Sequence, residues 1–281
     1  MAKILIAGCG DLGSGVAEKL VAQGHTVTGI RRTQRAFPDG VVGQTGDLLT
    51  MDDTQLPEVD LVFLIMTPQG RHEDAYRAAY FDTAQVLIRR YGSTATPPTV
   101  FFVSSTSVYG QNEGQWIDDS TPAQPHSATA KVLLEAELAL SAVFPSVAVR
   151  CSGIYGPGRF RMLEKVQSET PWEANSWTNR VHRDDVVSAL ELLSQLALKG
   201  NRLPEHVIVT DQTPVSMWEL KLWLASCLDA KIMAGAGKDF VPASGKRIQG
   251  QYLLSQGWRL NYPSYVAGYR DLIEAFKMLS S

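Results

Sequence analysis

The sequence has few cysteines, no excess of positive charge and no long apolar run. Its three cysteines, Cys9, Cys151 and Cys227, are widely spaced along 281 residues and form no CxxC pair. A disulfide framework or a structural zinc site is therefore not expected, and a reducing, cytoplasmic setting fits. The net charge of −3 disfavours nucleic-acid and anionic-membrane partners. No apolar run approaches the ~20 residues that a membrane-spanning helix requires.

A glycine-rich turn near the start is the most informative local pattern. Residues 4–7 form a short apolar, strand-like run, and residues 16–21 carry apolar side chains at helical spacing. Between these segments lies a G-x-G-x-x-G motif, which consists of Gly8, Cys9, Gly10, Asp11, Leu12 and Gly13. In a strand–turn–helix context, such a motif brings backbone and helix N–H groups to a pyrophosphate. A plain βα turn is the alternative interpretation, and the context favours dinucleotide binding.

The order of the apolar segments predicts the fold class. Strands are expected at residues 4–7, 26–30, 41–44, 59–66, 100–104, 147–150 and 207–210, and helices at residues 71–91, 126–144, 183–198, 215–228 and 265–278. This alternation predicts an α/β protein with a doubly wound parallel sheet, the Rossmann fold. We assign residues 1–155 and 183–212 to that domain. Residues 156–182 and 213–281 are assigned to a small interwoven C-terminal lobe, with a glycine-rich loop at residues 235–245.

The residues after the second expected strand bear on the choice of cofactor. NAD-binding folds place a carboxylate about 20 residues beyond the glycines, where it binds the ribose hydroxyls. Here that place holds Arg31 and Arg32. Guanidinium groups pair with a 2′-phosphate, so the sequence predicts NADP, with NAD as the alternative. Two arginines on a solvated loop remain the other interpretation.

Further cofactor contacts are expected where other strands end, because ligands of such sheets lie beyond the carboxyl ends of the strands. Asp47 follows the third strand and is placed to accept a hydrogen bond from an adenine amino group, although it could equally cap a turn. The other residues assigned to the binding set at these ends are Leu48, Met66 and Thr67.

Four later segments carry a family resemblance. They are SSTSVYG at residues 104–110, WIDDSTPAQP at 116–125, YGPG at 155–158 and HRDDV at 182–186. Together with the glycine turn they resemble the extended short-chain dehydrogenases/reductases, the NAD-dependent epimerase/dehydratase family. The tail, with KRI at residues 246–248, GW at 257–258 and YPSY at 262–265, looks like that of an atypical, YeeZ-like subgroup.

The resemblance implies roles for three residues. In the family, a serine or threonine hydrogen-bonds the substrate oxygen, a lysine holds the nicotinamide ribose, and a tyrosine four residues before that lysine is the acid/base. Ser105 matches the serine and Lys131 matches the lysine, but the tyrosine position holds Ser127. An alkyl hydroxyl is a much weaker acid than a phenol, whose pKa near ~10 a nearby cation can lower. The usual proton donor is therefore missing.

Several groups are conceivable substitutes for this donor. His126 precedes Ser127 and has a suitable ordinary pKa. Tyr109 and Tyr155 follow expected strands, and water or a substrate group could also move the proton. We place Tyr155 with the cofactor-binding residues, because tyrosines in such turns more often lie under the cofactor than donate protons.

These observations predict an NAD(P)-binding, epimerase/dehydratase-like protein without the usual catalytic tyrosine. The expected activity is that of an oxidoreductase or epimerase on a small polar or nucleotide-sugar substrate. The alternative is a non-catalytic NADP-binding redox sensor or regulatory protein. Family members often form homodimers through two helices that correspond to residues 71–91 and 126–144, so a homodimer is a further expectation.

Overall fold

The computed structural model of the chain describes residues 1–235 and 240–280. The loop expected at residues 235–245 therefore lies partly outside the described residues, as does residue 281 of the expected C-terminal lobe. The chain divides into two compact units. The first comprises residues 1–110, 123–151 and 187–207, and the second comprises residues 111–122, 152–186 and 208–281. Residues 111–122, 152–155, 183–186 and 208–212 thus fall in the second unit, although the sequence pattern predicted them in the Rossmann domain.

The central sheet of the chain is parallel and seven-stranded. Its strands are β1 (Lys3–Ala7), β2 (Thr26–Arg31), β3 (Val41–Thr45), β4 (Leu61–Leu64), β5 (Thr99–Ser105), β7 (Ser146–Cys151) and β11 (His206–Val209). They follow the order β11-β7-β5-β4-β1-β2-β3, so the direction of the strand order reverses at β1. In such sheets the ligand crevice lies at this reversal, beyond the carboxyl ends of the strands. The prediction of a doubly wound α/β fold is confirmed.

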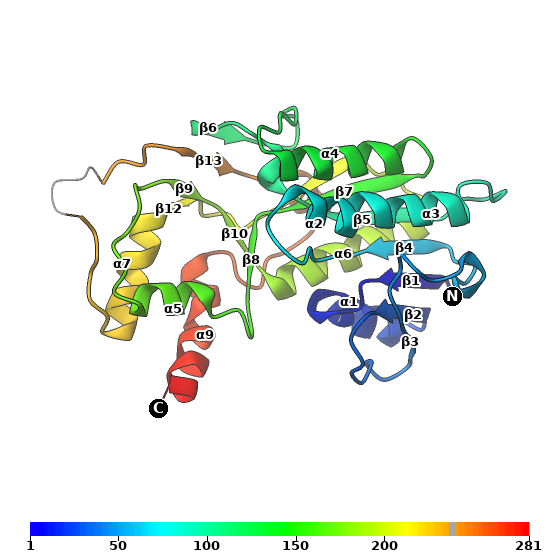
Figure 1. Ribbon diagram of the computed structural model, residues 1–281, viewed down its shortest axis with the longest axis horizontal. Helices are drawn as coiled ribbons and strands as arrows, with labels where there is room; N and C mark the ends of the chain where they lie inside the picture. Colours follow the sequence, from blue (N-terminus) through cyan, green and yellow to red (C-terminus); the bar gives the residue numbers. More distant parts are fainter. Residues whose placement is uncertain (236–239, 281) are drawn as a thin grey trace. The chain divides into compact units, whose positions relative to one another are not determined.

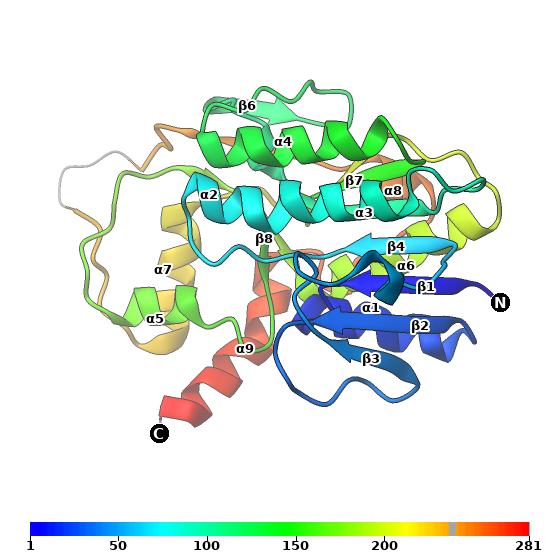
Figure 2. The same ribbon diagram turned by 45° about the vertical axis from the view of Figure 1, so that its right-hand side comes forward.

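Helices cover both faces of this sheet. They are α1 (Asp11–Ala22), α2 (Glu73–Tyr76), the π-helix η2 (Arg77–Asp82), α3 (Thr83–Tyr91), α4 (Ala128–Ser141) and α6 (Arg183–Leu198), with short 3₁₀ turns η1 (Asp53–Gln55) and η3 (Thr106–Val108). The helix α1 contacts β1 to β3, whereas α4 contacts β5 and β7. Figure 2 shows α1 on one face and α2, α3 and α4 on the other.

The helix expected at residues 71–91 is not regular. It begins at Glu73 and changes to π-helical geometry from Arg77 to Asp82 before α3. The Thr83 hydroxyl donates hydrogen bonds to the carbonyls of Ala79, at 2.6 Å, and Tyr80, at 3.2 Å. Such side-chain bonds to the preceding turn compete with the regular helical ladder. The wider turn is a deviation that apolar spacing alone does not reveal.

The second unit consists of short strands and a helical core. Its strands are β6 (Glu113–Ile117), β8 (Gly153–Tyr155), β9 (Trp177–Thr178), β10 (Arg180–His182), β12 (Val215–Ser216) and β13 (Gly245–Ile248), and its helices are α5 (Arg161–Gln167), α7 (Met217–Leu228), α8 (Tyr252–Ser255) and α9 (Tyr265–Ser280). Leu163, Leu224 and Ile273 from α5, α7 and α9 belong to one buried cluster, and Figure 1 shows these three helices side by side. Among the described residues, no helix has the length and apolar character needed to cross a membrane.

Candidate functional site

The glycine turn links the end of β1 to α1, and it is closely packed at Gly8 and Gly13. Gly8 has φ +97°, and a Cβ there would lie 1.9 Å from the Ile65 carbonyl oxygen. A Cβ on Gly13 would lie 2.4 Å from the Gly8 oxygen. Gly10 differs, because a Cβ there would meet nothing within 4 Å. The two outer glycines are required by the fold, whereas Gly10 leaves open space against the backbone, as the approach of a pyrophosphate requires.

The start of α1 is suited to an anion. Gly10 is the N-cap residue, and no side chain caps the helix. The N–H groups and partial positive charge of a helix N-terminus favour phosphate binding. The other residues of the motif have different surroundings: Cys9 and Leu12 are buried, Asp11 is exposed, and burial raises the pKa of the Cys9 thiol. Open space at the motif is therefore found at the backbone of Gly10.

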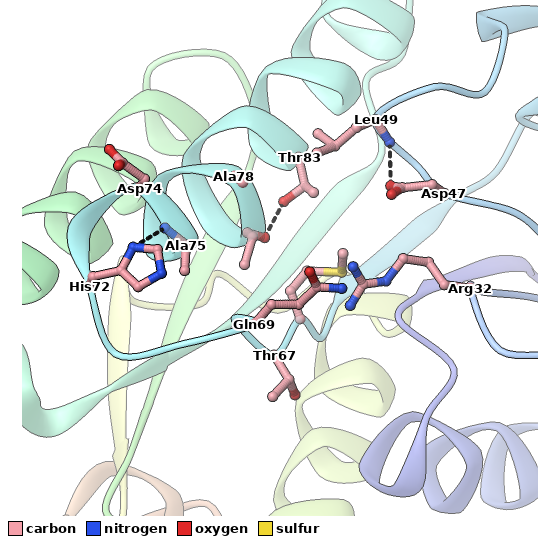
Figure 3. Close-up of a pocket in the computed structure, with 12 residues that line it drawn as sticks. Arg32, Asp47, Leu49, Thr67, Gln69, His72, Asp74, Ala75, Ala78 and Thr83 are labelled. Atoms are coloured by element: carbon pink, nitrogen blue, oxygen red, sulfur yellow. Dashed lines mark hydrogen bonds between the residues drawn. The ribbon is translucent and has the colours of Figure 1, made fainter.

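Two adjoining pockets extend from this turn within the first unit. The loop pocket, of about 260 Å³, is lined by Gly8, Gly10, Arg31, Arg32, Leu48 and Thr67, among others. The outer pocket, of about 320 Å³, is lined by residues that include Arg32, Asp47, Gln69, His72, Asp74 and Thr83 (Figure 3). Arg32, Met66 and Thr67 line both pockets. The two pockets therefore adjoin one another at the point where the strand order reverses, and we call them together the groove.

The two arginines after β2 have different surroundings. The Arg31 guanidinium donates to the Cys9 carbonyl at 3.3 Å and to the Arg35 carbonyl, and it lies 4.0 Å from the centre of the Phe37 ring. Arg31 therefore stabilises the glycine turn at Cys9. Arg32 is exposed, and its guanidinium lies beside Gln69 at the outer pocket (Figure 3). Both arginines line the loop pocket, but only Arg32 is exposed and lines both pockets.

Asp47 caps a turn and also lines a pocket, so its predicted contact with an adenine amino group stays a prediction. Its carboxylate accepts a hydrogen bond from the Leu49 N–H at 3.1 Å, so it caps a turn. It also lines the outer pocket, where Figure 3 shows it across from Gln69. No sequence motif marks the pocket-lining residues Gln69, His72 and Asp74. They lie in or after the connection between β4 and α2, which no glycine motif marks.

The three residues expected at the reaction end lie on neighbouring elements of the first unit. Ser105 ends β5 and accepts a hydrogen bond from the Ser107 N–H at 3.1 Å. Ser127 is the N-cap of α4, where its hydroxyl accepts from the Ala130 N–H at 3.2 Å. Lys131 is exposed one turn further along α4, and α4 contacts η3, the turn that follows Ser105. The serine in the tyrosine position therefore has a structural use as a helix cap.

The two tyrosines considered as substitute donors are buried. Tyr109 is 0% exposed, and its hydroxyl accepts a hydrogen bond from Arg150 at 2.9 Å. Tyr155 is 2% exposed and stacks on Tyr269 in the second unit, with ring centroids 4.6 Å apart. Burial raises the pKa of Tyr155. His126 is exposed. Neither phenol is thus presented as an accessible acid.

Comparison with known proteins places the chain in a family. The model of the NAD dependent epimerase/dehydratase family matches residues 4–203. The chain belongs to this family. Protein YeeZ of Escherichia coli K12 is 32% identical over 218 residues, which cover 72% of this chain and 76% of YeeZ. The resemblance inferred from the motifs is confirmed.

Solved structures agree with this assignment. A Methylobacillus flagellatus protein assigned to the NAD-dependent epimerases/dehydratases is 36% identical, with a TM-score of 0.83 over 98% of this chain and 99% of that one. UDP-glucuronic acid 4-epimerase from Bacillus cereus, in complex with UDP-glucuronic acid and NAD, is 18% identical, with a TM-score of 0.80 over 99% of both chains. The second similarity concerns the fold alone.

The HRDDV segment, residues 182–186, forms hydrogen bonds that hold the backbone of the second unit. Asp185 is fully buried and accepts hydrogen bonds from the backbone N–H groups of Asn261, at 2.6 Å, and Tyr262, at 3.0 Å. The Asp184 N–H donates to His182 Nδ1 at 3.2 Å. Within residues 1–235 and 240–280, no group of three or more His, Cys, Asp or Glu side chains is placed to hold a metal ion. This segment therefore anchors residues 261–262 within the second unit.

Cys151 is also accounted for by packing. It ends β7 and is 3% exposed. Burial raises the pKa of its thiol to about 12, so the thiol stays protonated at neutral pH. Since the thiolate is the nucleophilic form, Cys151 is not suited to covalent chemistry.

Proposed function

We propose that this chain binds NADP along the groove formed by the loop pocket and the outer pocket. The observation that carries the proposal is the exposed Arg32, which lines both pockets where a NAD-specific protein would place a carboxylate. Open backbone at Gly10 and the uncapped start of α1 suit the pyrophosphate, and Asp47 suits the adenine amino group. The residues present therefore fit a nicotinamide dinucleotide, the class of cofactor that the family implies.

The proposed activity is that of an oxidoreductase or epimerase on a small polar or nucleotide-sugar substrate. The cofactor would supply hydride transfer. The chain itself would supply Ser105 to polarise a substrate oxygen and Lys131 to hold the nicotinamide ribose, as in the family. Support for the substrate class comes from neighbours such as MoeE5, whose structure contains UDP-glucose and NAD. The second unit would then serve as the substrate or cover lobe.

A second candidate function is non-catalytic NADP binding, as in a redox sensor. It is favoured by the environment of the expected proton donors. Ser127 caps α4, and Tyr109 and Tyr155 are buried. On this view, Lys131 contributes to cofactor binding alone.

Two measurements test these proposals. Equilibrium titration should show NADPH binding more tightly than NADH, and equal affinities would contradict the NADP preference. Turnover of NADPH against a broad panel of carbonyl and nucleotide-sugar substrates then separates the two functions. Turnover by the parent that Lys131→Ala abolishes supports an enzyme. Turnover only after Ser127→Tyr supports the binder.

We also expect a cytoplasmic homodimer, formed through the helices α2 to α4. Sedimentation at micromolar concentration tests the oligomeric state, and a monomer there would contradict this expectation.

A further inference from the structure

A buried ionic cluster joins the elements that carry the candidate reaction residues. Glu137 on α4 and Arg150 on β7 are 6% and 5% exposed. Arg150 Nη2 lies 2.7 Å from Glu137 Oε2, and Arg150 Nε lies 3.3 Å and 3.2 Å from the two carboxylate oxygens. This pairing fixes the relative orientation of the two side chains, because the guanidinium is planar and its donors form a rigid fork.

Two more side chains complete what we call the Glu137 cluster. The Ser104 hydroxyl donates to Glu137 Oε1 at 2.5 Å, and Arg150 Nη1 donates to the Tyr109 hydroxyl at 2.9 Å. Ser104 lies in β5 and Tyr109 follows η3, so the four members come from four different segments of the first unit. The cluster therefore connects β5, β7, α4 and the chain after η3.

Stability alone is a weak explanation for this cluster. Burying an ion pair costs desolvation, and well-packed apolar residues of similar volume are often as stabilising. Burial opposes the charge of Arg150 and is the largest single influence on it, but the hydrogen bonds and charge attraction from Glu137, together with Tyr109, hold the pKa of Arg150 above its ordinary value. The cluster is thus a charged, geometrically specific connection, which an apolar core would not provide.

The members of the cluster are next to the candidate reaction residues. Ser104 directly precedes Ser105, and Glu137 lies on the same helix as Ser127 and Lys131. A change in the Glu137–Arg150 geometry would therefore move α4 relative to the end of β5, and with it Lys131 relative to Ser105. The glycine turn lies between β1 and α1 and Arg32 follows β2, and none of these three elements contributes to the cluster.

We propose that Glu137 and Arg150 are positioning residues that set Lys131 and Ser105 for the nicotinamide end of NADP. This inference rests on the proposed function. It predicts that the cluster affects binding of the nicotinamide end of the cofactor, whereas the groove at Arg32 binds the adenosine end. The alternative is a core ion pair with no effect on ligand binding beyond its effect on folding.

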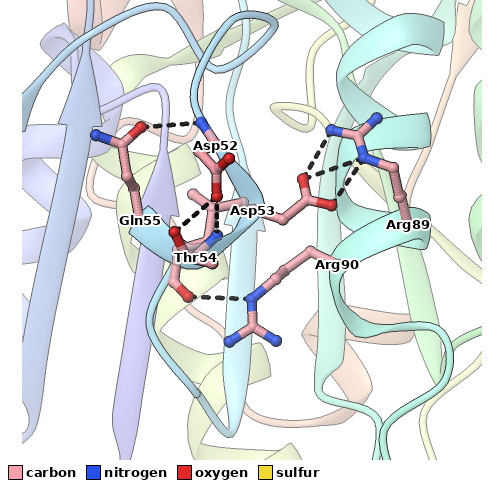
Figure 4. Close-up of polar contacts among 7 residues, drawn as sticks. Asp52, Asp53, Thr54, Gln55, Arg89 and Arg90 are labelled. Atoms are coloured by element: carbon pink, nitrogen blue, oxygen red, sulfur yellow. Dashed lines mark hydrogen bonds and ion pairs between the residues drawn. The ribbon is translucent and has the colours of Figure 1, made fainter.

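The test compares two ligands across matched variants. NADPH contains both ends, whereas adenosine 2′,5′-bisphosphate contains the adenosine and the 2′-phosphate but no nicotinamide. The double variant Glu137→Met/Arg150→Met removes the ion pair without leaving one charge buried. The control is Asp53→Asn/Arg89→Gln, which removes an exposed pair between η1 and α3 with contacts of 2.8 to 3.1 Å (Figure 4). Thermal unfolding is recorded for every variant.

We expect the double variant to bind adenosine 2′,5′-bisphosphate like the parent and NADPH about tenfold more weakly, a difference of one decade in Kd. The change in nicotinamide fluorescence on binding should shrink as well. The control should match the parent with both ligands. If the double variant keeps the parent's ratio of the two affinities, the positioning role is wrong. If the parent binds neither ligand, the proposed function itself fails, and this inference fails with it.

A milder variant covers the case in which the double variant does not fold. Ser104→Ala removes one hydrogen bond from the cluster and leaves the ion pair in place. It should weaken NADPH binding about threefold with no change for adenosine 2′,5′-bisphosphate, since the Glu137–Arg150 pair that fixes most of the geometry remains in place. An unchanged NADPH affinity in this folded variant would overturn the proposal.

Discussion

The two ends of the candidate site in the first unit differ in how completely they match their expected chemistry. At the groove, Gly10 leaves space, α1 begins without a side-chain cap and Arg32 is exposed. At the reaction end, Ser105 and Lys131 occupy the family positions, but Ser127 caps a helix where a phenol is expected. The proposed cofactor binding and the proposed proton transfer can therefore be tested separately, and only the predicted binding end contains every group that its chemistry requires.

The largest effect is expected at Gly10. The variant Gly10→Val keeps the fold, because a Cβ at this position meets no atom within 4 Å. Its side chain would occupy the space that the pyrophosphate needs, so NADPH affinity should fall by about 100-fold, or ~2.8 kcal/mol. Calorimetric titration and thermal unfolding measure the two quantities. A variant that binds NADPH like the parent would show that the ligand does not lie against this turn.

Gly8 provides the contrast for that variant. A Cβ there would overlap the Ile65 oxygen at 1.9 Å, and its φ of +97° is strained for other residues. Gly8→Ala should therefore lower the unfolding temperature as well as NADPH affinity. Of these two glycines, only Gly10 is expected to lose NADPH binding without loss of stability.

The next effect concerns the choice between the two nicotinamide cofactors. Arg32→Gln removes a charge-assisted contact with a 2′-phosphate, so NADPH should bind about tenfold or more weakly while NADH is unaffected. Arg35→Gln is the matched control, because it removes a nearby exposed positive charge. The contact of Arg35 with Arg31 is made by the Arg35 backbone carbonyl, which this substitution keeps. Equal losses for NADPH and NADH in Arg32→Gln would remove the basis for NADP preference.

A smaller effect is expected at Lys131, where the two ends of the site can be compared directly. Lys131→Ala should weaken NADPH binding severalfold, about 1 kcal/mol, because one exposed charged contact to the ribose is lost. Binding of adenosine 2′,5′-bisphosphate should stay unchanged. If both ligands lose affinity equally, Lys131 acts on the whole fold rather than on the nicotinamide end.

The sequence predicts local features of this site better than features made from distant segments. The strand, turn and helix around Gly10 follow from periodicity within some twenty residues, which is why that part was predictable. Arg31 and Arg32 look equivalent in the sequence. They differ because Arg31 meets the Cys9 carbonyl and the Phe37 ring, contacts that only the folded chain creates.

The interior of the first unit shows the same limit. Glu137 occurs within an Ala- and Leu-rich helix, and its partners Ser104 and Arg150 lie 33 and 13 residues away. In the sequence, none of these three residues is distinguished from an ordinary polar residue in or beside an apolar segment. Only the pairing of β5 with β7 brings them together beneath α4. The π-helical turn at residues 77–82, where the Thr83 hydroxyl bonds to the preceding carbonyls, is likewise not predicted by the spacing of apolar residues.

The smallest effect tests whether the serine in the tyrosine position is a structural residue. Ser127→Ala removes the acceptor for the Ala130 N–H at the start of α4, so the free energy of unfolding should fall by about 1 kcal/mol. NADPH affinity should not change, and any turnover of the parent should persist. Ser127→Asp, which keeps a capping oxygen, should recover most of the stability. Loss of turnover in Ser127→Ala with unchanged stability would instead show that this hydroxyl takes part in the reaction. The reaction end would then contain a group in the tyrosine position that contributes to catalysis, and it would differ less from the binding end than we infer.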